Sequence, residues 1–168
     1  QFHVAHSSLV SGVGVVAAGP YYCAENSLRH ALGRCMKGDE PIAVDELAGL
    51  TSEFALAGRI DPIANLANDR VWIFHGGADP VVAKPVVDAM QAYYELFVDP
   101  EGVQRNELAD AGHTFPAAAK GLQECGKTET PFVGRCGVDG ARQMLEHLYG
   151  AFGAQATGVR QGTLVHFS

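Results

Sequence analysis

The sequence predicts an α/β fold in which helices flank a parallel sheet. Two observations lead to this prediction. Short apolar segments rich in β-branched residues have the character of buried strands, and segments with helical periodicity alternate with them along the chain. A chain of 168 residues is also long enough to bury the core of one domain.

The elements follow from the local patterns in chain order. Residues 12–18 are small, apolar and β-branched, which predicts a strand buried on both faces. Residues 70–75 form the clearest strand, and Asp79 followed by Pro80 is typical of a helix N-terminus. The predicted strands are residues 12–18, 70–75, 103–109 and 162–167. The predicted helices are residues 44–57, about 80–97 and 139–152, with the end of another helix at 1–8.

Composition and charge exclude two classes of partner. The net charge is −7, and the 12 Lys and Arg residues are scattered, whereas phosphate binding needs them clustered. No apolar stretch approaches the roughly 20 residues that a membrane-spanning helix requires. We therefore expect neither a nucleic-acid partner nor a membrane span.

The four cysteines form two pairs that are close in sequence. Cys23 and Cys35 bracket one loop, and Cys125 and Cys136 bracket another. Two local disulfides are favoured, although four cysteines allow three connectivities and free buried thiols are an alternative. A zinc site is disfavoured because the chain lacks CxxC spacing and has no histidine beside either pair. Disulfides predict a secreted or periplasmic protein, and we expect no metal and no cofactor.

An acidic residue and a histidine follow two successive strands. Asp79 comes after the strand at 70–75, and His113 comes after the strand at 103–109. Because the carboxyl ends of neighbouring parallel strands meet at one edge of a sheet, we expect the two side chains to lie together. Their order matches the acid and the base of a Ser-His-Asp triad of the α/β-hydrolase type. Taken singly, Asp79 is explained by a helix cap and His113 by an ordinary loop histidine.

Three other histidines have no predicted catalytic role. His75 lies inside the strand pattern, which indicates a structural polar residue. His3 and His6 share one helical face, but the sequence offers no third ligand for a metal, so we expect both to face solvent.

A nucleophile is missing from the sequence. A nucleophile elbow needs Gly-x-Ser-x-Gly between a strand and a helix. None of the nearby serines has this context: Ser7, Ser8, Ser11, Ser27 and Ser52. Because the chain opens with what has the pattern of a helix body, we expect the nucleophile a few residues before Gln1.

Longer segments carry a family resemblance that runs nearly end to end. They are QFHVAHSSLVSGVGVVAAGPYYCAE, RCMKG, VWIFHGGADPVV, AGHTFP, the ECG…GRCGVDGA loop and TGVRQGTLVHFS. In these segments the chain resembles the secreted poly(3-hydroxybutyrate) depolymerases, in particular the single-domain, circularly permuted α/β-hydrolase type.

The resemblance implies a set of roles. Asp79 and His113 become the triad acid and base, and the disulfides become Cys23–Cys35 and Cys125–Cys136. The family pattern places a Gly-Leu-Ser elbow upstream of Gln1. It also places a second half, with a His-Gly-Cys oxyanion-hole segment and substrate-gripping aromatic residues, after the closing strand. Residues 1–168 would then be an incomplete catalytic domain whose partners are the remaining segments of the same enzyme.

The predicted function is ester hydrolysis through an acyl-serine, with a polymeric or oligomeric ester such as poly(3-hydroxybutyrate) as substrate. The isolated chain is predicted to be inactive because it lacks the serine. The alternatives are a related hydrolase of poly(aspartic acid) or of feruloyl or acetyl esters. A non-catalytic binding protein that keeps the fold is the alternative of another class.

Overall fold

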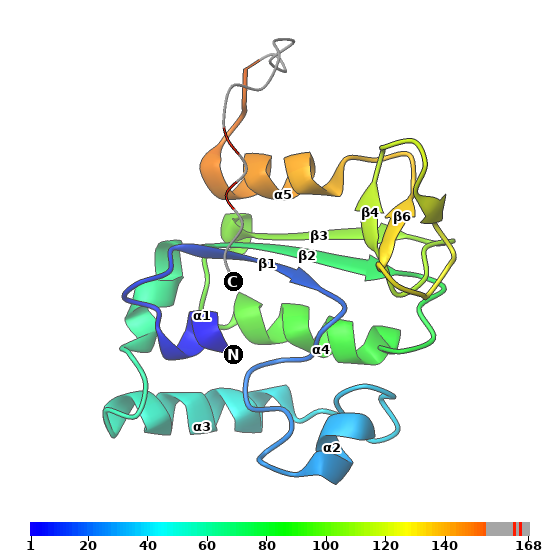
Figure 1. The fold of residues 1–168 in the computed structure, drawn as a ribbon. Coiled ribbons are helices and arrows are strands. Elements are labelled where there is room, and N and C mark those ends of the chain that lie inside the picture. The colour runs from blue at the N-terminus through cyan, green and yellow to red at the C-terminus, as the bar shows by residue number, and fades with distance from the viewer. Residues whose placement is uncertain (154–162, 164, 166–168) are drawn as a thin grey trace.

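A parallel sheet with helices on both faces forms the centre of the molecule (Figure 1). The computed structural model describes residues 1–153, 163 and 165. Helix α5 lies over one face of the sheet and helix α4 over the other. The strands, in spatial order, are β1 (Gly12–Val16), β2 (Arg70–Gly76) and β3 (Val103–Leu108), and the two helices are α4 (Lys84–Glu95) and α5 (Gly140–Tyr149). This is the α/β arrangement that the sequence predicts.

A second, smaller sheet stands beyond the carboxyl ends of the main strands (Figure 1). Its strands run parallel in the order β4-β6-β5. Helix α3 packs against α4 on the side away from the main sheet. The other helices and strands of the described residues are α1 (Phe2–Ala5), α2 (Leu28–Leu32), α3 (Val44–Leu56), η1 (Ile63–Asn68), η2 (Pro100–Gly102), β4 (Phe115–Ala117), β5 (Gln123–Glu124) and β6 (Val133–Arg135).

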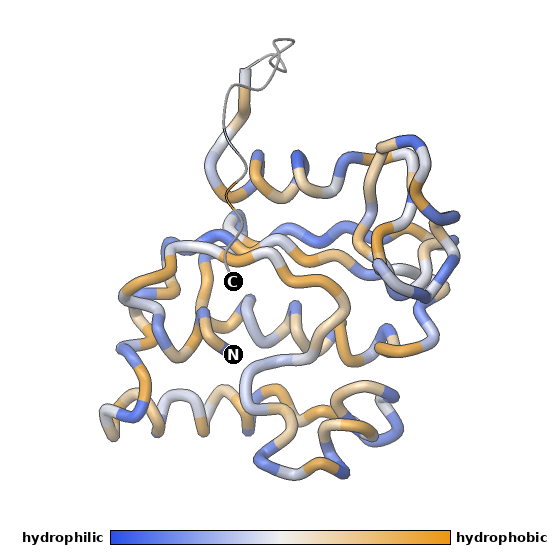
Figure 2. The backbone as a smooth tube through the Cα atoms, in the orientation of Figure 1, coloured by the Kyte–Doolittle hydropathy of each residue, from blue (hydrophilic) through white to orange (hydrophobic). Residues whose placement is uncertain are grey.

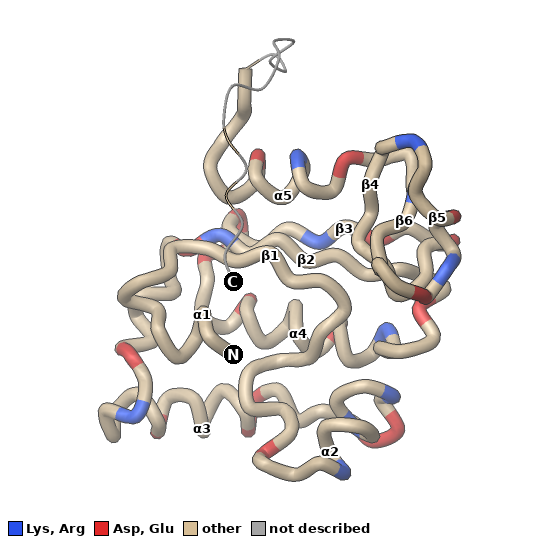
Figure 3. Tube along the Cα trace, viewed as in Figure 1, with Lys and Arg blue, Asp and Glu red and all other residues tan. Residues whose placement is uncertain are grey.

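Strand β2 is the buried centre of the core. Side chains alternate across a strand, so Val71 and Ile73 join the core on the α4 side, whereas Trp72 and Phe74 join the core on the α5 side. All four are essentially inaccessible to solvent. Figure 2 shows the hydrophobic residues concentrated along β1 and β2, and Figure 3 shows charged residues mainly on the helices and loops. The β2 strand is thus a rigid platform for the loop that follows it.

Strand β1 differs from its prediction. Its residues are half-buried, and Gly14 is exposed, although the sequence predicted burial on both faces. Val13 and Val15 do pack against the core on the α4 side. The reason is position, because among the described residues β1 pairs with β2 alone and therefore lies at one side of the sheet.

Helix α4 begins later than predicted. The sequence pattern placed its N-terminus at Asp79 and Pro80, but the helix starts at Lys84, with Pro85 in its first turn. The helix predicted to about residue 97 also ends earlier, at Glu95, and Leu96 just beyond it is 51% exposed. The segment between β2 and α4 is a loop instead, and the carboxylate of Asp79 shapes it.

The other predicted elements agree more closely. The helices predicted at 44–57 and 139–152 and the strands at 70–75 and 103–109 differ from the observed bounds by at most a few residues. The strand predicted at 162–167 lies outside the described residues, apart from 163 and 165. Within the described ranges, no helix has the length and apolar character needed to cross a bilayer.

His3 is buried, which corrects the expectation that it faces solvent. Its side chain on α1 is sealed between Asp69, just before β2, and Tyr94 on α4. The Nε2–H donates to the Asp69 carboxylate at 3.0 Å, and the Tyr94 hydroxyl lies 3.1 Å from Nδ1. Burial lowers the pKa of His3 below its usual value, although the Asp69 hydrogen bond and charge oppose this. This network ties α1 to the start of β2.

Candidate active site

Asp79 and His113 meet at the carboxyl edge of the main sheet. Strands β2 and β3 are adjacent and parallel, and Gly76 at the end of one is in register with Leu108 at the end of the other. The loops that follow therefore leave the sheet side by side, and Asp79 Oδ2 lies 2.9 Å from His113 Nδ1. The structure thus brings together the two residues that the sequence singled out, 34 positions apart.

The Asp79 carboxylate is buried and held from two sides. Its side chain has no exposed surface. Oδ1 accepts hydrogen bonds from the backbone N–H groups of Val81 and Val82, at 2.7 and 2.9 Å, while Oδ2 faces the imidazole. These bonds close the turn after β2, and the chain enters helix α4 only at Lys84. The carboxylate consequently has a fixed orientation toward the histidine.

Glycine allows the two loops to touch. A Cβ on Gly76 would lie 2.3 Å from the carbonyl oxygens of Ala111 and Gly112, closer than real atoms approach. The Ala78 N–H donates to the Ala111 carbonyl at 2.9 Å across the same contact. Only a residue without a side chain fits at position 76, and this close approach sets the distance between the Asp79 loop and the His113 loop.

His113 presents one ring nitrogen for chemistry. Because a carboxylate only accepts, Nδ1 carries a proton toward Asp79, and Nε2 is the nitrogen with a lone pair. The side chain is 30% exposed, so the ring borders solvent rather than the core. An imidazole in this tautomer has the geometry of a general base oriented by an acid.

The loop between Cys125 and Cys136 supports His113 from the other side. The structure joins Cys125 to Cys136 and Cys23 to Cys35, the pairs implied by the family resemblance. The His113 N–H donates to the hydroxyl of Thr128 at 2.9 Å, and the Gly112 N–H donates to the Cys125 carbonyl at 3.0 Å. The disulfide-closed loop therefore sets the backbone position of the histidine.

Sequence reasoning missed two residues of this loop. Thr128 holds the backbone of His113, and Phe132 places its ring 6.1 Å from the imidazole, centroid to centroid. The loop has no helical or strand periodicity, so no pattern marked them. The one available signal was the cysteine pair itself, which indicated that the segment had a fixed shape.

The remaining polar residues have structural contacts. His75 is buried, and its Nε2–H donates to the Val82 carbonyl at 3.1 Å, consistent with the structural role predicted for it. Ser7 and Ser52 donate to backbone carbonyls, Ser8 donates to Asp61, and Ser27 caps α2. None of these four bonds involves His113. Across the described residues, no three His, Cys, Asp or Glu side chains cluster in the manner of a metal site.

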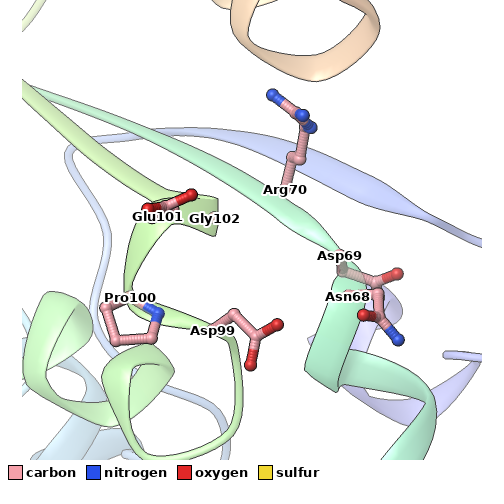
Figure 4. Close-up of a pocket in the computed structure, with 7 residues that line it drawn as sticks. All are labelled: Asn68, Asp69, Arg70, Asp99, Pro100, Glu101 and Gly102. Atoms are coloured by element: carbon pink, nitrogen blue, oxygen red, sulfur yellow. The ribbon is translucent and has the colours of Figure 1, made fainter.

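One hollow of the molecule is remote from this pair. It has a volume of about 510 Å³ and is lined by residues at the amino-terminal ends of β2 and β3, including Arg70, Asp99 and Glu101 (Figure 4). Asp79 and His113 lie at the opposite ends of the same strands. The hollow and the Asp79–His113 pair are therefore separate features of the fold.

Comparison with known proteins identifies close relatives. The chain is 40% identical over 156 residues, 92% of its length, to a poly(3-hydroxybutyrate) depolymerase of Delftia acidovorans. It is 29% identical over 171 aligned positions to a polyhydroxybutyrate depolymerase of Talaromyces funiculosus. The chain spans 31% of the bacterial relative and 49% of the fungal one. No family model matches the chain.

A solved structure shares the fold as well. The crystal structure of a PHB depolymerase from Penicillium funiculosum superposes with a TM-score of 0.77 at 26% identity, covering 89% of this chain and 46% of that one. A serine-to-alanine variant of a PHB depolymerase, solved in complex with an R3HB trimer, matches equally well. These matches confirm the predicted α/β-hydrolase fold, and over nearly its whole length the chain is similar to poly(3-hydroxybutyrate) depolymerases.

Proposed function

We propose that this chain supplies the acid and the base of a serine hydrolase that cleaves a polyester such as poly(3-hydroxybutyrate). The observation that carries the proposal is the hydrogen bond between Asp79 Oδ2 and His113 Nδ1, 2.9 Å long, at the carboxyl edge of a parallel sheet. The carboxylate is buried and the imidazole is partly exposed, which is the division that an orienting acid and a working base require.

The chemistry divides between the two residues. Asp79 holds the imidazole in the tautomer with the proton on Nδ1 and stabilises the imidazolium when it forms. His113 Nε2 removes the proton of a serine hydroxyl as the serine attacks the ester carbonyl. The resulting imidazolium then gives the proton to the departing alcohol, leaving an acyl-serine. Water cleaves that ester in a second step, with the same nitrogen again acting as base.

The nucleophile in this proposal lies outside residues 1–168, a few residues before Gln1. The proposed serine would precede α1, whose His3 is fixed to Asp69 at the start of β2. The relatives support this view, because both are longer than this chain. The 168 residues alone are accordingly expected to be inactive.

The substrate class follows from the relatives. Both are named as depolymerases of polyhydroxybutyrate, and a related structure holds an R3HB trimer. Amide hydrolysis of poly(aspartic acid) would use the same pair of residues on a different bond. The relatives favour the ester.

The two disulfides favour an oxidising compartment. We accordingly propose that the protein is secreted or periplasmic.

Labelling and turnover together test the proposal. The protein that carries this chain should react with a fluorophosphonate probe and release 3-hydroxybutyrate oligomers from granules, and His113→Ala should abolish both. Polyaspartate and feruloyl esters are the comparison substrates. Activity of the purified 168 residues that disappears in His113→Ala would contradict the external serine, whereas equal granule hydrolysis by wild type and His113→Ala would contradict the role of the base.

A further inference from the structure

An exposed phenyl ring stands beside the imidazole of His113. The ring centroids of Phe132 and His113 are 6.1 Å apart and the ring planes meet at 80°, an edge-to-face arrangement. Phe132 is 43% exposed, and the His113 side chain is 30% exposed. Both rings are therefore partly exposed to solvent where they lie next to each other.

The backbone holds Phe132 in an unfavourable conformation. Its φ is +57°, a left-handed value that is a rare outlier for a bulky residue. The Phe132 N–H donates to the Glu129 carbonyl at 2.7 Å, and its carbonyl accepts from the Phe115 N–H at 2.8 Å. These bonds over-determine the position of the residue. Glycine would adopt this left-handed conformation without strain, so the backbone geometry does not explain why a phenylalanine occupies the position.

Fixing the imidazole does not account for the ring either. The Nδ1 side of His113 is oriented by Asp79 at 2.9 Å, and its backbone is held by Thr128 at 2.9 Å. A third constraint from a half-exposed ring adds little to this pair. What the ring does provide is a partly exposed apolar surface beside the imidazole that we propose as the base.

We propose that Phe132 is a specificity-determining residue that forms an apolar wall against the carbon chain of the ester unit under attack. The inference rests on the proposed function and assigns a substrate class to that site: esters of short aliphatic acids, such as 3-hydroxyalkanoates. A phenyl face recognises methyl and methylene groups by excluding water from them, and each such group contributes to selectivity. Acids with charged or strongly polar chains, such as aspartate units, are rejected by the same surface.

Variants at position 132 distinguish a substrate-binding role of Phe132 from a structural one. Phe132→Gly removes the ring and relieves the backbone, and Phe132→Leu keeps an apolar side chain. Tyr149→Ala removes an aromatic ring of α5 that is 75% exposed and is the matched control. Each is measured, in the protein that carries this chain, with p-nitrophenyl acetate, butyrate and hexanoate. Thermal unfolding is recorded in parallel.

The expected result is a change in KM that depends on the acyl chain. Phe132→Gly should raise KM for butyrate and hexanoate about tenfold, with a smaller effect on acetate, while kcat changes less than about threefold. Phe132→Leu should recover most of the loss, and Tyr149→Ala should match wild type. The pH profile of kcat/KM should keep its shape. A uniform fall in kcat for all three esters would overturn the proposal and assign Phe132 to positioning of His113. An unchanged KM for all three esters would also overturn the proposal.

Direct binding distinguishes failure of this inference from failure of the proposed function. Calorimetric titration with a 3-hydroxybutyrate trimer is carried out in an Asp79→Asn background, which keeps an oxygen for the Val81 and Val82 amides and slows turnover. Adding Phe132→Gly should weaken trimer binding about tenfold. If the trimer binds through Phe132 but wild type hydrolyses no ester, only the proposed function fails. If wild type hydrolyses esters and the trimer binds equally with and without the ring, only this inference fails.

Discussion

Asp69 and Asp79 lie just beyond the two ends of strand β2, and each carboxylate holds a histidine ring at about 3 Å. The pairs differ in surroundings. His3, bound to Asp69, is 3% exposed, whereas the side chain of His113, bound to Asp79, is 30% exposed. One fold thus contains a buried Asp–His pair and a partly exposed one. We expect the buried pair to contribute to stability and the partly exposed pair to contribute to activity.

The partly exposed pair should control turnover with little effect on stability. In the protein that carries this chain, His113→Ala is expected to reduce kcat by roughly 10³-fold or more, because the base is lost. The His113 side chain is 30% exposed, and Asp79 keeps its hydrogen bonds from the Val81 and Val82 amides, so the thermal midpoint should fall by only a few degrees. Steady-state kinetics and calorimetry check both. A kcat within tenfold of wild type would contradict the role given to His113.

The buried pair should control stability. Asp69→Ala leaves His3 buried without its partner and is expected to lower the free energy of unfolding by about 1–3 kcal/mol. Chemical denaturation measures this loss, and Asp99→Ala, at an exposed acid of the neighbouring hollow, is the control. No difference between the two variants would show that the buried network adds nothing to stability.

The His3 pair also predicts a pH dependence. Burial lowers the pKa of His3 in the folded protein, so the unfolded chain binds the proton at a higher pH than the folded chain does. This contribution to stability is complete above the unfolded value of about 6.5 and is lost as pH falls from there to the folded pKa. Urea midpoints between pH 8 and 5 should therefore decline more steeply in wild type than in His3→Gln. Parallel curves would argue against a lowered pKa.

The two disulfides should differ in what they control. Each closes a short loop, so removing either by a Cys→Ala pair should cost about 3 kcal/mol of stability. Only the Cys125–Cys136 loop holds His113, through Thr128. Its removal should also lower kcat, whereas removal of Cys23–Cys35 should leave kcat near wild type. Thiol titration of the unfolded, unreduced protein should find none of these four cysteines reactive, and equal kcat in both variants would contradict the difference.

Two glycine substitutions should have opposite effects. Gly76→Ala drives a Cβ into the backbone of the His113 loop and is expected to destabilise by about 3 kcal/mol or more, with loss of activity. Gly49→Ala, in the interior of α3 with no neighbour near its Cβ, should stabilise by about 0.5–1 kcal/mol. Denaturation curves give both signs, and a neutral Gly76→Ala would show that the two loops can separate.

The sequence predicted the site better than its surroundings. Asp79 and His113 each follow a strand, and the geometry of parallel sheets alone then brings them together. The predicted start of helix α4 was wrong because an aspartate before a proline fits a helix cap and a loop turn equally well. In the structure, the backbone bonds of Asp79 to Val81 and Val82 close a turn instead.

Long-range packing explains the other errors. His3 is buried by residues 66 and 91 positions away, and the periodicity of its own helix carries no information about them. Thr128 and Phe132 act through a loop whose shape depends on a disulfide and on contacts with two other loops. Such residues become visible only when the tertiary structure places them beside the histidine.

Strand β1 has a practical consequence for work on this chain. It pairs with β2 on one side only among the described residues, and Gly12–Val16 carries no charged residue (Figure 3). An uncharged strand whose backbone groups on one side have no strand partner within the described residues is a template on which a second chain can add. We therefore expect the purified 168 residues to self-associate as their concentration rises. Light scattering over a dilution series would reveal this, and inactivity of the isolated chain should be judged only at concentrations where it is monomeric.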